Sequence, residues 1–435
     1  MKFYLSCIIL LFLNSEIRAQ ANTEKIFTSD IYHFWEAYDQ IRATEDSAEQ
    51  YKLLKELYFD KGSPGLAAIR QARRYSDKDY IDAINNHPLF WKSIRPNTLK
   101  AKDYAAEISQ GLEGLKKIYP DLKPAHIYFT IGAFRTPGTT MDSLVLIGSE
   151  LAMTNKETLT TEFSPRFSYL RNYFDSEPIK EIVFLNIHEY VHTQQIFDYG
   201  YDLLTFCLYE GIAEFMAVKA SGKTSPTPAI AFGKENDAWV KEVFSKEMFS
   251  YYNDRWLWNN FENEFKMRDL GYYMGYAIAE KYYEEADDKQ AAVKELIELK
   301  FTDKKVVWNF VDGTKYFDKP LAEYEADYES RRPTVTKLLS FENGNQEVDP
   351  NTTEIAVTFS HEMLPGYYST GFGEKGRDYL PEITGVRFAE DNKGAIYEVK
   401  LEPGKEYQFM VGMGFRLPNG VQLKPYEISF RTKSL

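Results

Sequence analysis

The fold of this chain is decided by the stretch Ile179–Ile196, which reads IKEIVFLNIHEYVHTQQI. Its apolar residues recur at helical spacing, and neither glycine nor proline interrupts it, so the pattern predicts a helix. His188 and His192 stand four residues apart, a separation that puts both side chains on one face of a helix. Two imidazoles placed in this way can bind a single metal ion.

A third candidate ligand lies on a second predicted helix, from about residue 203 to residue 220. Glu210 follows His192 by eighteen positions. Two imidazoles and one carboxylate leave the fourth position of a zinc ion open to water, which is the arrangement of a catalytic site. We therefore expect one Zn²⁺ per chain, bound by His188, His192 and Glu210, with Glu189 placed to act as a base on the bound water. The alternative is a pair of surface histidines on an amphipathic helix, with Glu210 in an ordinary salt bridge.

Two small residues near Glu210 predict how the second helix packs. Gly211 lacks a side chain, so we expect it to allow a close approach to the helix that carries His188 and His192. We expect Cys207 to be buried as a small apolar residue between the same two helices.

The arrangement resembles the gluzincins, a group of zinc metallopeptidases that includes thermolysin and the leukotriene-hydrolase and aminopeptidase enzymes. The string Tyr209–Ala213 reads YEGIA and is similar to the segment that holds the glutamate ligand in the aminopeptidases. Glu214 matches a residue that hydrogen-bonds a ligand histidine in thermolysin-like enzymes, a contact that orients the imidazole. Tyr272, within Gly271–Ala279, matches a tyrosine that stabilises the oxyanion. The alternatives are a solvated helix face for Glu214 and, for Tyr272, a structural aromatic cluster or a role taken by Tyr276.

The resemblance implies a secreted bacterial zinc metallopeptidase that hydrolyses a polypeptide substrate. Zinc-bound water would attack the peptide bond, Glu189 would take and pass on the proton, and Tyr272 would stabilise the oxyanion. A hypothesis of a different class stays open: a degenerate gluzincin fold that serves, with or without zinc, as a cell-surface assembly or binding factor without a proteolytic role. An intact Glu189 favours the enzyme, because a binding role needs the ligands but not the base.

The chain as a whole predicts an α+β protein, mainly helical, with a small β-sheet and a C-terminal β-sandwich. Apolar runs at residues 126–132 and 143–148 predict a hairpin. From Thr334 onward, apolar and polar residues alternate between turn residues, a pattern typical of a β-sandwich, and Val348–Met363 resembles the opening of bacterial Ig-like domains. The expected organisation is a signal peptide (1–21), an N-terminal helical region (22–118), a zinc metallopeptidase domain (119–332) and an Ig-like domain (334–435).

The N-terminal residues and the composition bear on location and partners. Residues 1–21 have the basic start, apolar core and A-x-A end of a signal peptide, so we expect export to the periplasm, the cell surface or the medium. Cys7 lies inside the apolar core rather than after it, which argues against a lipoprotein anchor, and no stretch is long enough for membrane insertion. The net charge of −13 at pH 7 becomes −14 without the signal peptide and disfavours nucleic acid as a partner. The sequence does not predict the oligomeric state.

Overall fold

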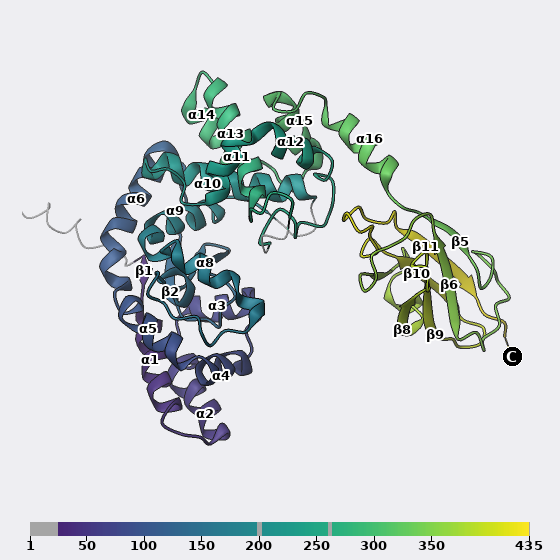
Figure 1. The fold of residues 1–435 in the computed structure, drawn as a ribbon, viewed down its shortest axis with the longest axis horizontal. Coiled ribbons are helices and arrows are strands. Elements are labelled where there is room, and N and C mark those ends of the chain that lie inside the picture. The colour runs from purple at the N-terminus through teal and green to yellow at the C-terminus, as the bar shows by residue number, and fades with distance from the viewer. Residues whose placement is uncertain (1–24, 198–201, 260–262, 435) are drawn as a thin grey trace, which may run out of the picture. The chain divides into compact units, whose positions relative to one another are not determined.

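The computed structural model describes residues 25–197, 202–259 and 263–434 and shows an α+β protein, as the sequence predicts (Figure 1). The predicted signal peptide, with Cys7, lies outside the described residues. Among the helices described, none combines the length and the apolar character needed to cross a membrane. The described residues form two compact units, the first drawn from residues 25–196, 213–226 and 286–299 and the second from residues 197, 202–212, 227–259, 263–285 and 300–434.

The first unit contains a run of helices whose starts follow from their capping residues. The Asp46 side chain accepts hydrogen bonds from two N–H groups in the first turn of one helix, and Ser76 and Asp79 form a reciprocal capping box on another. Proline occupies the first helical position at Pro64 and Pro88, where its missing N–H has no cost. The helices are α1 (Ser29–Ile41), α2 (Ser47–Leu54), α3 (Pro64–Ala72), α4 (Asp77–Asn86), α5 (Pro88–Thr98), α6 (Ala105–Ile118), α7 (Ser149–Ala152), α8 (Tyr169–Asp175), α9 (Ile182–His192) and α14 (Lys289–Ile297).

A four-stranded sheet of order β1-β2-β4-β3 lies in the same unit. The predicted hairpin is wrong in its pairing, because the two predicted runs pair in parallel, with Ile127 opposite Val145. The connection between them holds a further strand, β3, which forms the antiparallel hairpin with β4. Strands β2 and β4 are buried along almost their whole length, as is typical of parallel strands covered on both faces. The strands are β1 (Ile26–Phe27), β2 (His126–Thr130), β3 (Gly138–Met141) and β4 (Leu144–Gly148).

The second unit contains residues 203–212 of α10 and several further helices, which pack closely where glycines face each other. A Cβ atom on Gly211 of α10 (Leu203–Ser221) would lie 2.2 Å from the backbone nitrogen of Tyr276, and one on Gly275 would lie 1.8 Å from the carbonyl oxygen of Cys207. The prediction that Gly211 faces the helix of His188 is therefore wrong, because this glycine faces α13. Cys207 is buried, and its backbone also lies against α13. The other helices are α11 (Pro228–Glu235), α12 (Asp237–Ser245), α13 (Leu270–Glu285), α15 (Lys304–Thr314) and α16 (Leu321–Arg331).

The C-terminal part of the second unit consists of two antiparallel sheets, of order β5-β6-β9-β8 and β11-β10-β7. Alternate side chains of each sheet point into one shared core, to which Val357 and Tyr397 contribute from the first sheet and Phe409 and Phe430 from the second. This alternation is the pattern on which the prediction of strands was based. The strands are β5 (Val335–Leu338), β6 (Glu354–Phe359), β7 (Thr370–Phe372), β8 (Glu382–Phe388), β9 (Gly394–Lys400), β10 (Glu406–Val411) and β11 (Tyr426–Arg431).

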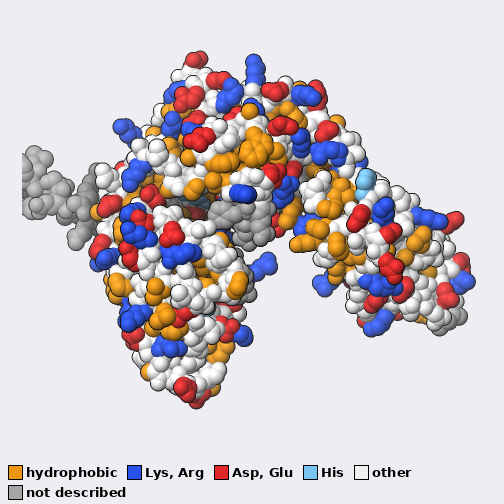
Figure 2. All heavy atoms as spheres, in the orientation of Figure 1, with side chains coloured by type: hydrophobic (Ala, Val, Ile, Leu, Met, Phe, Trp, Pro, Cys, Tyr) orange, Lys and Arg blue, Asp and Glu red, His pale blue; other side chains and the backbone are white. Residues whose placement is uncertain are grey.

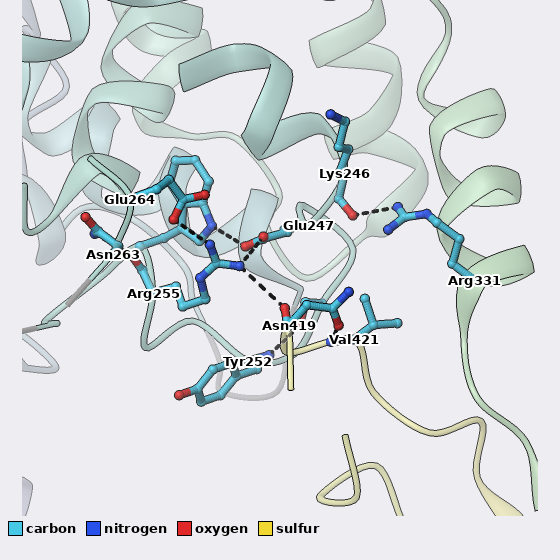
Figure 3. A network of polar contacts seen from close by, with 11 residues as sticks. Lys246, Glu247, Tyr252, Arg255, Asn263, Glu264, Arg331, Asn419 and Val421 are labelled. Carbon is cyan, nitrogen blue, oxygen red and sulfur yellow. Dashed lines mark hydrogen bonds and ion pairs between the residues drawn. The ribbon is translucent and has the colours of Figure 1, made fainter. Parts of the chain in front are cut away.

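A polar network joins the helical and strand parts of the second unit (Figure 3). The guanidinium group of Arg255 forms ion pairs with Glu247 and, at 2.7 Å, with Glu264. The same group donates a hydrogen bond of 3.4 Å to the carbonyl oxygen of Asn419, which follows β10. Arg255 therefore ties a loop of the helical part to a loop of the strand part.

The surface carries charges of both signs. On the face shown in Figure 2, basic and acidic side chains are interspersed, with apolar side chains between them. Exposed ion pairs such as Lys78–Asp82 (2.6 Å) and Lys234–Glu280 (2.8 Å) are typical of this surface. Pairs of this kind contribute little to stability.

Candidate metal centre

Helix α9 carries both predicted histidine ligands, and contacts on its other side fix the orientation of the helix about its own axis. A Cβ atom on Gly111 of α6 would lie 2.7 Å from Cδ1 of Ile187, so the two helices pack closely at this point. The hydroxyl of Tyr190 accepts a hydrogen bond of 2.8 Å from the backbone just before β2. These contacts leave the face that bears His188 and His192 directed toward α10, whose Glu214 lies 3.0 Å from His188.

The two imidazoles converge. Their Nε2 atoms are 3.1 Å apart, and the two residues are only 6% and 7% exposed. The other ring nitrogen of each faces a side-chain oxygen: His188 Nδ1 lies 3.0 Å from Glu214 Oε2, and His192 Nδ1 lies 2.7 Å from Gln195 Oε1. An amide oxygen accepts hydrogen bonds, so Nδ1 of His192 carries the hydrogen and its Nε2 presents a lone pair; the carboxylate beside Nδ1 of His188 favours the same tautomer in that ring. A cation between the two lone pairs would stabilise this arrangement.

The third predicted ligand comes from α10. One ligand atom from each of His188, His192 and Glu210 lies within 4.8 Å of the other two, and Glu210 is buried like both histidines. Glu214 follows one helical turn later, on the same side of α10. Its second oxygen accepts a hydrogen bond from Ser225. One helix thus supplies both the candidate carboxylate ligand and the carboxylate that contacts His188.

The donor set suits a divalent transition metal. Two nitrogens bound to one zinc ion at about 2.0–2.1 Å in tetrahedral geometry lie about 3.3 Å apart, close to the 3.1 Å between the two Nε2 atoms. Imidazole nitrogens favour zinc and its neighbours in the transition series, whereas magnesium and calcium prefer sites made only of oxygen. A buried carboxylate also needs a compensating positive charge, which an ion at this position would provide.

Glu189, the predicted base, is buried beside the edge strand β3. A Cβ atom on Gly138 would lie 2.5 Å from Glu189 Oε1, so a larger residue at this point of the strand would displace the carboxylate. The carbonyl oxygen of Gly138 accepts hydrogen bonds from Thr136 and, at 3.4 Å, from Arg73. The backbone of β3 therefore covers one side of Glu189.

Tyr272 lies in the first turn of α13. Its side chain is half-buried, and its N–H donates a hydrogen bond of 3.0 Å to the carbonyl oxygen of Asp269. The tyrosine that follows it, Tyr273, donates a hydrogen bond of 2.7 Å to Asp237. The oxyanion-stabilising role expected of Tyr272 stays a prediction.

Gln195 is the residue at this centre that the sequence interpretation missed. It is buried and contacts His192, three positions before it. A polar residue that closely follows a helix with two candidate ligands was the available signal. Adjacent glutamines at positions 194 and 195 share that signal, so only the structure shows which of them reaches the histidine.

Comparison with known proteins identifies a family. Residues 15–268 match the sequence model of a lipoprotein family described as gliding motility protein GldB. No curated protein matches the chain. Among solved structures, the chain is 12% identical to the crystal structure of the S-layer protein rSbsC(31-844) and 15% identical to surface layer protein SbsC, domains 1–6. In each case 76% of this chain is covered, the TM-score is 0.18, and the chain spans less than half of the other, 46% and 45%. With so low a TM-score, neither structure supports a shared fold.

The family match overturns the main functional prediction. The interpretation as a gluzincin, a secreted zinc metallopeptidase and hence a hydrolase, is wrong, because the matched residues include both α9 and α10 and belong to a gliding motility family. Two histidines and a glutamate that converge offer ligands to a cation, but a set of ligands does not by itself specify what the protein does with that cation. The finding agrees better with the alternative, a cell-surface factor without a proteolytic role. Because the match covers residues 15–268, more than half of the chain, this protein belongs to the GldB family of gliding motility lipoproteins.

Proposed function

We propose that this protein is an assembly or binding factor of the bacterial cell envelope, that it serves gliding motility, and that it has no proteolytic role. We propose further that it holds one zinc ion with His188, His192 and Glu210. The observation that carries the proposal is the convergence of three buried ligand atoms, within 4.8 Å of one another, in a chain of a gliding motility family. Glu189 and Tyr272 are not catalytic in this proposal.

The family also supports a location at the cell envelope or the cell surface. The export that we expect from residues 1–21 agrees with this location, and those residues lie outside the described ones. The argument from Cys7 against a lipoprotein anchor finds no support in a lipoprotein family.

Zinc would act in this protein as a link between two helices. His188 and His192 belong to α9 and Glu210 belongs to α10, so one ion bound by all three would hold the helices together. An ion that binds the folded chain and not the unfolded chain stabilises the fold. Three side-chain ligands leave one position of a tetrahedral zinc ion for water or for a group of a partner molecule.

Glu214 supports the proposed ion through His188. One oxygen of its carboxylate lies 3.0 Å from Nδ1 of that ring, and Ser225 donates a hydrogen bond to the other oxygen. A carboxylate in this position fixes the tautomer of the imidazole and raises the basicity of the Nε2 atom that binds the metal.

Complementation of a gliding bacterium that lacks this protein tests the proposal. The strain receives the wild-type gene, Glu189→Gln, or the double variant His188→Ala/His192→Ala, and each protein is matched for abundance in the envelope fraction. We expect Glu189→Gln to restore gliding to the wild-type speed, because the proposed function uses the metal ligands but no base. We expect the double variant to fail, and elemental analysis to find about one zinc per chain in the first two proteins only.

Each part of the proposal can fail separately. Loss of gliding in Glu189→Gln, with zinc content and abundance unchanged, would contradict the non-proteolytic role. A wild-type protein without zinc, purified under metal-replete conditions, would contradict the metal. Normal gliding with both His188 and His192 replaced would show that motility does not depend on this centre.

We propose also that residues 334–435 form an Ig-like sandwich that acts as a binding module. The support is the pair of antiparallel sheets with one shared core, together with the resemblance of Val348–Met363 to the opening of such domains. Deletion of the sandwich should abolish gliding while leaving zinc binding by the helical part intact. Loss of both together would contradict a separate role.

A further inference from the structure

The glutamine that follows α9 has the geometry of a residue that positions a metal ligand. Gln195 is 8% exposed, and its Oε1 lies 2.7 Å from Nδ1 of His192. Because α9 ends at His192, the turn that follows the helix makes this contact. We propose that Gln195 is a positioning residue that holds His192 in the tautomer in which Nε2 carries the lone pair that would bind a metal ion. This inference rests on the proposed zinc site and deepens it.

The direction of the hydrogen bond follows from the chemistry of the amide. An amide oxygen can only accept, so the contact between Nδ1 and Oε1 requires that Nδ1 of His192 carries the hydrogen. Nε2 then presents its lone pair toward Nε2 of His188, at 3.1 Å. The opposite amide orientation would place the NH₂ group of Gln195 against Nδ1, and the ring hydrogen would move to Nε2, where it would block the metal position.

The two imidazoles are supported by different groups, for an electrostatic reason. Glu214 supports His188 with a carboxylate, whereas Gln195 supports His192 with a neutral amide. The buried centre already holds the carboxylates of Glu189, Glu210 and Glu214. A carboxylate at position 195 would add a fourth negative charge to this site, where burial already makes each negative charge unfavourable. The amide accepts the same hydrogen bond without adding that charge.

The neighbouring glutamine provides a matched control. Gln194 is 6% exposed, almost as deeply buried as Gln195. Its side chain accepts a hydrogen bond of 2.8 Å from the N–H of Lys123 and donates to the carbonyl oxygen of the same residue at 3.3 Å. Its replacement therefore removes a buried amide next to the centre without touching the contact to His192.

Zinc affinity in four forms of the full chain tests the inference: wild type, Gln195→Met, Gln195→Glu and Gln194→Met. The dissociation constant is measured by competition with a chromophoric zinc chelator. We expect Gln195→Met to raise it by about 10- to 100-fold, the usual effect of losing the group that orients a ligand histidine. We expect Gln195→Glu, whose oxygens still accept the bond, to bind zinc at least as tightly as the wild type. Gln194→Met should match the wild type even where it lowers stability.

A second measurement reports the tautomer directly and needs no zinc. The chain has six histidines, so ¹⁵N labelling of histidine alone yields a spectrum in which the His192 ring can be assigned by its loss in His192→Ala. We expect the hydrogen of the metal-free wild-type ring to reside on Nδ1 and to move to Nε2 in Gln195→Met. Circular dichroism confirms that each variant is folded.

The outcomes separate this inference from the proposed function. An unchanged tautomer in Gln195→Met, or equal weakening of zinc binding by Gln195→Met and Gln195→Glu, would overturn the positioning role. Equal weakening by Gln194→Met would show an effect of packing alone and would overturn it too. A wild-type protein that binds no zinc would overturn the proposed metal, while the tautomer measurement would still decide the role of Gln195.

Discussion

The substitution Gly275→Ala tests the contact between α10 and α13, on which the position of Glu210 depends. A Cβ atom at this position would lie 1.8 Å from the carbonyl oxygen of Cys207, whereas carbon and oxygen atoms in contact are about 3.3 Å apart. The two helices must therefore separate by about 1.5 Å. The obstructing atom belongs to the backbone of α10, so it cannot be relieved by a change of rotamer.

The expected loss of stability follows from this displacement. A gap of that size removes much of the dispersion contact between the two helices, and inserting a methyl group into a packed core costs about 1–3 kcal/mol when side chains alone move. Because backbone must move here, we expect a loss of about 3 kcal/mol, in spite of a gain of about 1 kcal/mol from the helix propensity of alanine. The midpoint of guanidinium unfolding, followed by circular dichroism, measures it.

Gly313→Ala is the matched control. Gly313 lies within α15, is exposed, and has no atom within 4 Å of the position of an added Cβ. Alanine at this position should raise stability by up to about 1 kcal/mol. If Gly275→Ala is as stable as the wild type, or shifts in the same direction as Gly313→Ala, the close approach of α10 and α13 is wrong.

Three further predictions concern the metal, a buried acid and the network of Figure 3. Zinc at 100 times its dissociation constant should stabilise the wild type by about 2.7 kcal/mol, measured as a shift of the unfolding midpoint. The same zinc concentration should not change the unfolding midpoint of His188→Ala. Burial raises the pKa of Glu150 to about 7, above its unfolded value of 4.5, so its contribution to stability is complete below about pH 4.5 and is lost as the pH rises toward 7. Between pH 4.5 and pH 7 the unfolding midpoint should therefore fall less steeply with pH in Glu150→Gln than in the wild type. Equal pH dependence in the two proteins would refute this prediction. Arg255→Met removes the positive charge that pairs with the carboxylate of Glu247 and should lower the free energy of unfolding by about 1–2 kcal/mol. Lys246→Met breaks an exposed ion pair and should lower it by less than about 0.5 kcal/mol. Equal losses in the two variants would contradict a stabilising role of the network.

The candidate centre was predictable where its geometry is local. The four-residue spacing of His188 and His192 is a property of any helix, and the apolar run around them predicts that helix. The same spacing places Glu214 one turn after Glu210, and the structure brings it to His188. Gln195 was missed because its contact is made by a turn, whose path no periodic pattern predicts.

The function was mispredicted although the motif residues converge. The convergence of three ligand side chains favours the binding of a cation, but it does not specify what the protein does with that cation. The chain belongs to a gliding motility family, and this finding, rather than the spacing of any residues, corrected the interpretation.

The sequence by itself determined the α+β class and the side chains that share a helix face, because both follow from the hydrophobic period of neighbouring residues. Tertiary structure alone decided that Gly211 faces α13, that β2 pairs in parallel with β4, and that β3 covers Glu189. These features join segments that are far apart in the chain. Their pairing depends on the total free energy of many packing contacts, no one of which is visible in a local pattern.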